Sequence, residues 1–75
     1  MHRYKSLSGH SGIRAFDIKQ DSIKIEFNDG SIYLYDDKKP GPVHLAQMKK
    51  LAIKGQGLTT YINKWVRQNF AAKLK

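Results

Sequence analysis

The most constraining feature of this sequence is an Asn-Asp-Gly triplet at residues 28–30 that separates two strand-like segments. Before it, residues 22–28 (SIKIEFN) alternate apolar and polar side chains, which is typical of a strand with one buried face. After it, residues 31–35 (SIYLY) are rich in β-branched and aromatic side chains. Asp-Gly between two such runs is a strong signal for a β-hairpin. The centre of the chain therefore predicts an antiparallel sheet.

Two turn geometries would place the hairpin tyrosines on opposite faces of that sheet. A two-residue loop pairs Phe27 with Ile32 and turns Tyr33 and Tyr35 away from the apolar face, where they could stack on bases. A type I turn followed by a left-handed glycine pairs Phe27 with Ser31 and turns both tyrosines toward the apolar face. The triplet suits the second geometry, and two helices need a large apolar face to cover. We therefore expect core tyrosines with their hydroxyls at the rim.

A strand before the hairpin completes the predicted sheet. Residues 12–18 (GIRAFDI) have a strand-like composition, and residues 19–21 connect them to the hairpin. The fold class is α+β: a three-stranded antiparallel β-meander packed by two C-terminal helices, in the order β-β-β-α-α. Residues 1–11 are polar and predict a flexible N-terminal arm. The single domain is expected to span residues 12–72, with residues 73–75 as a C-terminal tail.

Two helices are predicted after the sheet. Pro42 suits the first position of a helix and Gly55 suits the residue that ends one, so we expect a helix over residues 42–53. A second helix is expected from residue 59 or 60 to about residue 72. The predicted core combines the inward side chains of the strands and helices. It consists of Ile13, Phe16, Ile18, Ile23, Ile25, Phe27, Leu45, Met48, Tyr61, Ile62 and Trp65.

Positive charge is concentrated in the second half of the chain. The 75 residues carry a net charge of +8 at pH 7, and all six acids precede residue 38. From residue 38 onward there are nine basic residues and no acid. A basic half without interspersed acids points to a polyanion, usually nucleic acid, although a solubilising surface is the alternative.

The candidate binding residues come from the predicted helices and the hairpin. Lys64 and Arg67 are three residues apart and are therefore neighbours on the polar face of the second helix. Together with Lys50, Lys54 and Lys73 they could track a phosphate backbone; a solvated helix face is the alternative. The hairpin tyrosines Tyr33 and Tyr35 could add base stacking, and Asn63 could contact a base or phosphate or make a partly buried hydrogen bond.

No catalytic or metal-binding arrangement is apparent in the sequence. Cysteine is absent, which excludes disulfides and thiolate metal sites, and His2, His10 and His44 lack the spacing of metal ligands. We therefore expect no enzyme activity, no cofactor and no small-molecule substrate. No apolar run approaches the roughly 18 residues of a membrane span, and the first residues do not resemble a signal peptide, so a cytoplasmic protein without a membrane partner is expected.

The ordered motifs of this chain resemble the KTSC domain family. The resemblance rests on residues 11–13 (SGI), Phe16-Asp17, the hairpin 27–35 with its Tyr-x-Tyr, and Gly57 followed by residues 61–67 (YINKWVR). The chain departs from the family pattern in the loop after the hairpin and at the C-terminus. The family is named for a C-terminal segment of some lysyl-tRNA synthetases and also occurs as a small stand-alone bacterial or phage domain. Its function is unassigned, and the resemblance implies RNA binding.

Charge and resemblance together favour a nucleic-acid-binding module. We expect weakly sequence-specific binding, to RNA before DNA, through phosphate contacts. The alternative is a protein-protein interaction module, phage-encoded, whose basic surface meets an acidic protein partner. The sequence leaves the oligomeric state open.

Overall fold

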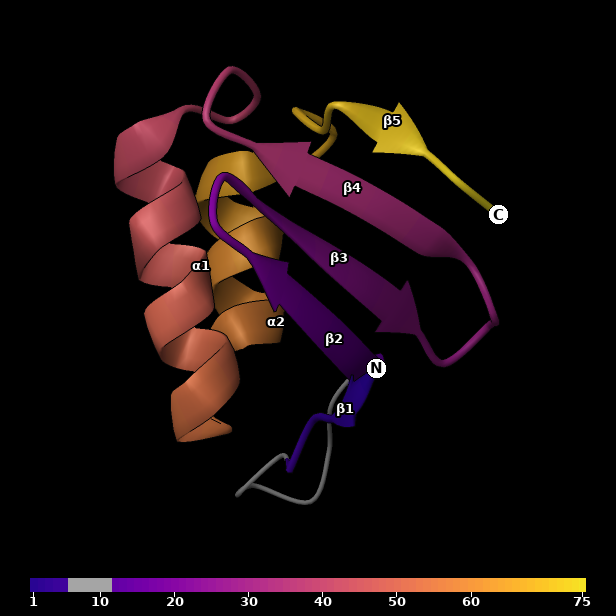
Figure 1. The fold of residues 1–75 in the computed structure, drawn as a ribbon. Coiled ribbons are helices and arrows are strands. Elements are labelled where there is room, and N and C mark those ends of the chain that lie inside the picture. The colour runs from indigo at the N-terminus through magenta and orange to yellow at the C-terminus, as the bar shows by residue number, and fades with distance from the viewer. Residues whose placement is uncertain (6–11) are drawn as a thin grey trace.

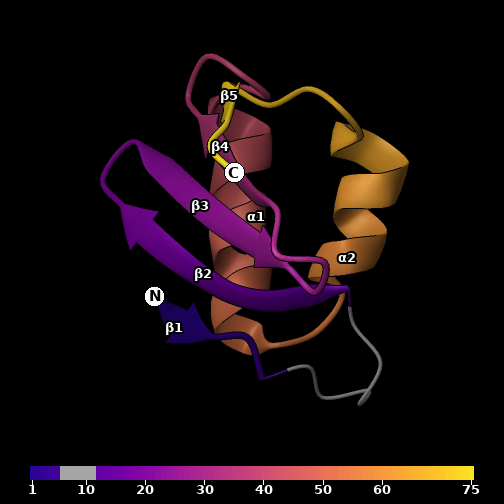
Figure 2. The ribbon, with the colours of Figure 1, turned by 90° about the vertical axis from the view of Figure 1, so that its right-hand side faces the viewer.

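The chain folds into an antiparallel sheet whose one face is covered by helices. The computed structural model describes residues 1–5 and 12–75. In that part of the chain the sheet has five strands in the spatial order β1-β2-β3-β4-β5. They are β1 (His2–Arg3), β2 (Ile13–Lys19), β3 (Ser22–Phe27), β4 (Ile32–Asp36) and β5 (Ala72–Lys73). The helices are α1 (Pro42–Lys54), α2 (Leu58–Tyr61) and a π-helical continuation of α2, η1 (Ile62–Val66). Figures 1 and 2 show them on one side of the sheet.

The predicted α+β class is confirmed, but the prediction of three strands is wrong. The predicted meander corresponds to β2, β3 and β4, with ends that differ by a residue. Strand β1 comes from the segment expected to be an arm, and β5 joins the last residue of the expected domain, Ala72, to the first residue of the expected tail, Lys73. Both are two residues long and lie at the edges of the sheet. There they pair with backbone N–H and C=O groups of β2 and β4 that would otherwise have no partner in the sheet.

The hairpin adopts the bulged geometry that the Asn-Asp-Gly triplet favours. The N–H of Phe27 donates to the carbonyl of Ser31 at 2.8 Å, and Ile25 pairs with Tyr33. Gly30 has φ 89°, in the left-handed region that glycine adopts without steric cost. Tyr33 therefore shares the inner face of the sheet with Ile25, and the prediction of inward-facing tyrosines is confirmed.

Helix α1 follows its sequence signals closely. It starts at Pro42, and Gly55 with φ 76° ends it by donating its N–H to the carbonyl of Leu51 at 2.9 Å. This left-handed cap satisfies a carbonyl that the last helical turn would leave without a partner. The buried side chains are the expected inward stripe of Leu45, Met48 and Ala52.

The second helix is shorter than predicted. It was expected to reach about residue 72, but it ends at Val66, and Arg67 leaves the helical region with φ 53°. The chain then returns to the sheet, where the N–H of Ala71 donates to the carbonyl of Leu34 at 2.8 Å. If the helix continued, the outer N–H and C=O groups of β4 would have no backbone partners. Pairing with β4 satisfies these groups, which explains why the chain leaves the helix here.

The first residues of the predicted N-terminal arm pair with the sheet. Residues 6–11 of that arm lie outside the part of the chain that the structure describes. In residues 1–5, β1 pairs with β2, and Tyr4 is buried with 6% of its surface exposed. The Tyr4 hydroxyl accepts a hydrogen bond from the N–H of Leu58 at 3.3 Å. Tyr4 thus satisfies an N–H of the first turn of α2, which has no partner within the helix.

The core lies between the sheet and the helices. Its buried side chains are Tyr4, Ile13, Phe16, Ile23, Ile25, Tyr35, Leu45, Met48, Ala52, Leu58, Ile62 and Val66. Ile18, Phe27 and Tyr61, which were predicted for the core, pack against it while partly buried. Trp65 is the wrong prediction, because 60% of its surface is exposed. The inward stripe of α2 and η1 consists of Leu58, Ile62 and Val66, and Trp65 lies off that stripe.

Candidate nucleic-acid interface

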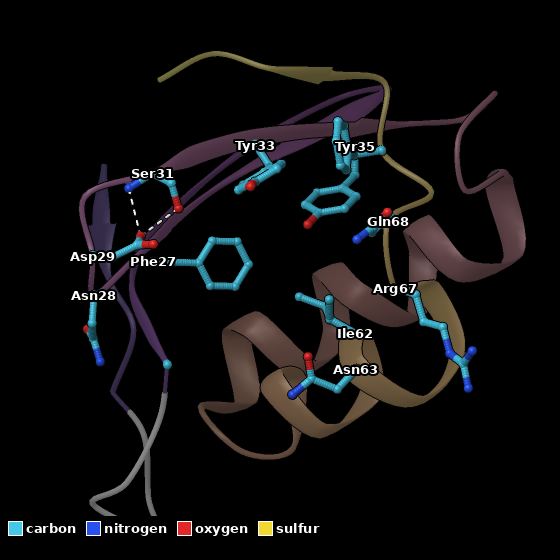
Figure 3. Close-up of a pocket in the computed structure, with 12 residues that line it drawn as sticks. Phe27, Asn28, Asp29, Ser31, Tyr33, Tyr35, Ile62, Asn63, Arg67 and Gln68 are labelled. Carbon is cyan, nitrogen blue, oxygen red and sulfur yellow. Dashed lines mark hydrogen bonds between the residues drawn. The ribbon is translucent and has the colours of Figure 1, made fainter.

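A cavity of about 450 Å³ lies between the β3–β4 hairpin and η1 (Figure 3). Four of the predicted binding residues line it: Tyr33, Tyr35, Asn63 and Arg67. The tyrosines come from β4, whereas Asn63 and Arg67 come from η1 and from the residue that ends it. The fold therefore brings together side chains that are about thirty residues apart in the sequence.

Aromatic rings form the sheet side of this cavity. Phe27 and Tyr33 meet nearly at right angles, with ring centroids 5.5 Å apart and an interplanar angle of 83°. Phe70 packs edge-on against Tyr33, with ring centroids 4.7 Å apart. In Figure 3 the ring of Phe27 is seen face-on and that of Tyr33 almost edge-on. These rings are only partly buried, so aromatic surface is accessible from the cavity.

Tyr35 forms the deepest aromatic wall of the cavity. Its side chain is 2% exposed, and its hydroxyl points into the cavity in Figure 3. Burial disfavours the charged phenolate and raises the pKa of Tyr35 to about 12. The hydroxyl is therefore neutral at physiological pH and can both donate and accept a hydrogen bond.

Two cations stand at the edge of the cavity. Lys73 of β5 lies opposite Tyr33 in the strand pairing, and the Lys73 Nζ lies 5.7 Å from the centre of the Tyr33 ring. Arg67 is exposed, and in Figure 3 its guanidinium points away from the tyrosines. Both positive groups can thus reach a bound molecule from outside without filling the cavity.

Asn63 and Lys64 occupy neighbouring positions on η1 with different surroundings. Asn63 is exposed and lines the cavity, so the alternative of a partly buried hydrogen bond does not hold. Lys64 is exposed outside the cavity, and its Nζ lies 5.5 Å from the centre of the Trp65 ring. Lys64 and Trp65 therefore form an exposed cation–aromatic pair on the outer surface of η1.

The two predicted lysines of α1 do not join the cavity. Lys50 and Lys54 are exposed near the end of α1, and α1 and the second helix run antiparallel in Figure 1. Arg67 at the end of η1 thus lies at the opposite end of the helical layer from Lys54. At 1.5 Å per residue, a helix of this length separates its ends by roughly 20 Å. The predicted cations form two groups, one beside the cavity and one at the far end of α1.

Two acids mark the ends of β4. Asp29 lines the cavity, and its carboxylate accepts hydrogen bonds from the hydroxyl and then the N–H of Ser31, which lower the pKa of Asp29. Asp36 accepts from the N–H groups of Lys39 and Lys38, which lower the pKa of Asp36. These acids fix turns, and the carboxylate of Asp29 adds a negative charge at the hairpin end of the cavity.

Sequence reasoning misplaced three residues in this region of the molecule. Gln68 and Phe70 line the cavity but were placed in the second helix. Trp65 was placed in the core although it is exposed. The early end of the helix places Gln68 and Phe70 at the cavity, and no glycine or proline marks the positive φ of Arg67 at that point. Trp65 lies within η1, off its buried stripe.

A second cavity of about 680 Å³ lies between β1, β2 and α1. It is more apolar, with Phe16, Ile18, Ala52 and Ile53 as walls and Arg3 and Lys5 beside them. None of the predicted binding residues lines this cavity.

Comparisons with known proteins place no constraint on this site. No protein family model, no curated protein and no solved structure matches the chain. The resemblance to the KTSC family stays a prediction. Within the described ranges, no helix has the length and apolar character needed to cross a bilayer.

Proposed function

We propose that this protein is a binding module, not an enzyme, and that it binds nucleic acid, RNA before DNA, mainly through phosphate contacts. The observation that carries this function is the cavity beside η1. There, accessible aromatic rings lie beside an amide and the exposed cations Arg67 and Lys73, and both cations come from the part of the chain after residue 37, which contains no acid. Aromatic rings flanked by cations are the combination that proteins use to bind single-stranded nucleic acids without sequence preference.

The charge of the second half is available for phosphates. In residues 1–5 and 12–75, the ion pairs are Arg14 with Glu26 at 3.6 Å and Lys19 with Asp17 at 4.0 Å. None of them involves a residue after 37. The basic side chains from Lys50 onward are all exposed, so their charge is not neutralised within the molecule. Phosphate contacts that release counterions would give binding with a strong salt dependence.

RNA is favoured over DNA by two considerations. The resemblance to the KTSC family implies RNA, and RNA is recognised most often through unpaired bases that stack on aromatic side chains. The accessible rings of Phe27, Tyr33 and Phe70 are suited to stacking on unpaired bases and less suited to contacts in the groove of a duplex.

A titration of fluorescently labelled single-stranded RNA at low and high salt tests this function. We expect affinity to fall steeply with added salt, and a double variant with Lys64→Glu and Arg67→Glu to weaken binding to all sequences alike. The matched control reverses the same charge in the first half, with Lys19→Glu and Lys24→Glu. Undetectable binding at low salt, or binding that salt leaves unchanged, would contradict phosphate contacts. Equal loss in the control would show that net charge alone matters.

One observation favours a second function, binding of an acidic protein partner. Trp65 is 60% exposed and Val43 is 79% exposed. Exposed tryptophan beside basic side chains is typical of the residues that dominate protein interfaces. Purification of the protein from its host distinguishes the two functions. Copurified nucleic acid, seen in the absorbance ratio, supports the first, and a stoichiometric acidic protein lost on Trp65→Ala supports the second.

A further inference from the structure

The cavity between the hairpin and η1 has the size of a site for a small planar group. Its volume of about 450 Å³ falls within the range of small-molecule sites. The hairpin forms one side and η1 the other, as Figure 3 shows. A base within a duplex is stacked and paired on all sides, so only an unpaired base can enter such a space.

The aromatic walls offer a defined stacking geometry. A base that lies flat on the face of Phe27 meets the Tyr33 ring at an angle near 83°, in an edge contact. Stacked and edge-to-face arrangements are the two that aromatic groups prefer. Ile62, which is 4% exposed, closes the helix side of the cavity with an apolar surface. One base would therefore gain both a stacking platform and an apolar wall.

Polar groups surround the position of such a base. The amides of Asn63 and Gln68 line the cavity and are exposed, and the Tyr35 hydroxyl points inward. Amides and hydroxyls both donate and accept hydrogen bonds, so the edge of any base finds partners. This chemistry provides binding with weak base preference.

The charges give the bound strand an orientation. The carboxylate of Asp29 lies at the hairpin end of the cavity and repels phosphate there. Arg67 lies at the opposite end in Figure 3, with its guanidinium directed outward. The phosphates of the strand are therefore expected on the Arg67 side, while the base points toward Phe27.

We infer that this cavity binds one unpaired nucleobase of a single-stranded nucleic acid, stacked on Phe27 and bordered by Asn63, with the neighbouring phosphate at Arg67. This inference rests on the proposed nucleic-acid binding and names the part of the ligand that the cavity takes. It separates base capture in the cavity from the phosphate contacts of the helices.

The test uses an RNA hexamer with one fluorescent 2-aminopurine base, alone and annealed to its complement. We expect the single strand to bind tighter than the duplex and the 2-aminopurine emission to change on binding. Phe27→Leu keeps an apolar side chain but removes the ring, and should lower affinity for the single strand roughly tenfold. Asn63→Ala, at an exposed position that does not threaten folding, should weaken single-strand binding and leave duplex binding unchanged.

Matched controls isolate the cavity from general stability. Phe16→Leu makes the same change in a ring of β2 outside this cavity, and Lys64→Ala removes an exposed side chain from η1 outside it. Circular dichroism checks the fold of each variant. Phe16→Leu should retain the 2-aminopurine response, and Lys64→Ala should weaken single strand and duplex equally.

Several outcomes would overturn base capture. Equal affinity for single strand and duplex, or wild-type binding by folded Phe27→Leu and Asn63→Ala, would mean that no base enters the cavity, even with salt-dependent binding intact. A mononucleotide that binds as tightly as the hexamer would mean that the site serves a free nucleotide instead of a strand. Absence of any RNA binding at low salt would remove the proposed function itself.

Discussion

The two helical regions that cover the sheet are built in different ways. Helix α1 has 13 regular residues, begins with a proline and ends with a glycine whose φ is 76°. The second helix has one α-helical turn, widens into the π-helix η1, and ends at Arg67, a non-glycine residue with φ 53°. Helix α1 buries a continuous stripe against the sheet, whereas η1 leaves a cavity between itself and the β3–β4 hairpin.

This difference separates a supporting helix from the one that carries the candidate site. π-helical turns and non-glycine residues with positive φ occur often at functional sites, where the surrounding structure holds a conformation that is unfavourable locally. Asn63 and Arg67 depend on that irregular backbone for their place at the cavity.

Truncation of the core should show the largest difference. Met48→Ala in α1 removes a side chain that is fully buried, and we expect a loss of about 3–5 kcal/mol in the free energy of unfolding. Ile62→Ala in η1 should cost nearer 2 kcal/mol, because one side of Ile62 already faces a cavity and makes fewer contacts there. Urea denaturation measures both. Equal losses would mean that η1 is packed as closely as α1.

Alkaline pH should destabilise the protein through Tyr35, beneath the cavity. The pKa of Tyr35 rises from 10.0 in the unfolded chain to about 12 in the fold, because burial disfavours the phenolate. The folded state therefore holds this proton more tightly, and stability is complete below pH 10 and lost as the pH rises through 12. Two pKa units correspond to about 2–3 kcal/mol.

Urea midpoints on either side of this pH window measure the effect. Tyr35→Phe should remove this part of the alkaline loss, and Tyr33→Phe should retain it. A Tyr35→Phe protein that loses as much stability as the wild type would show that the alkaline transition arises elsewhere.

Arg67→Gly should stabilise the fold while weakening binding. Glycine adopts φ 53° without the clash that an L side chain suffers, so we expect a gain of about 1 kcal/mol in the free energy of unfolding. Lys64→Gly, within η1, is the matched control and should lose roughly 0.5–1 kcal/mol. Thermal unfolding and the RNA titration measure the two properties. A less stable Arg67→Gly protein would mean that this position carries no strain.

Trp65→Ala should have the smallest effect on stability, within about 0.5 kcal/mol, because 60% of Trp65 is exposed. Its neighbour Val66 is 2% exposed, and Val66→Ala should cost more although it removes far fewer atoms. Denaturation of both variants gives the comparison. A large loss in the free energy of unfolding for Trp65→Ala would show that Trp65 packs in the core, as the sequence pattern predicts.

Local signals were sufficient for the parts of the fold that local rules govern. The Asn-Asp-Gly triplet correctly predicted the bulged hairpin and the inward face of Tyr33 and Tyr35. Pro42 and Gly55 correctly predicted the bounds of α1 to within one residue. In each case the conformation depends on residues that are neighbours in the sequence, as turns and helix caps do.

The remaining features depend on partners far away in the sequence. Tyr4 packs in the core, where its hydroxyl accepts a hydrogen bond from the N–H of Leu58, 54 residues away. The second helix stops early because residues 71–75 pair with β4, and no helix-breaking residue marks that point. The candidate site shares this dependence. Its tyrosines were predictable from the hairpin, but Gln68 and Phe70 reach the cavity only because the helix ends at Val66.

The short strand β5 also protects an edge of the sheet from pairing with other strands. β4 contains the segment Ile32–Asp36, whose aromatic and β-branched residues are prone to pair with other strands when an edge is open. β5 occupies that edge through the bonds of Ala71 to Leu34 and of Leu74 to Ile32. Lys73, exposed on β5, places a charge on the new outer edge. The same lysine that stands over Tyr33 therefore helps to keep the sheet from growing into an aggregate.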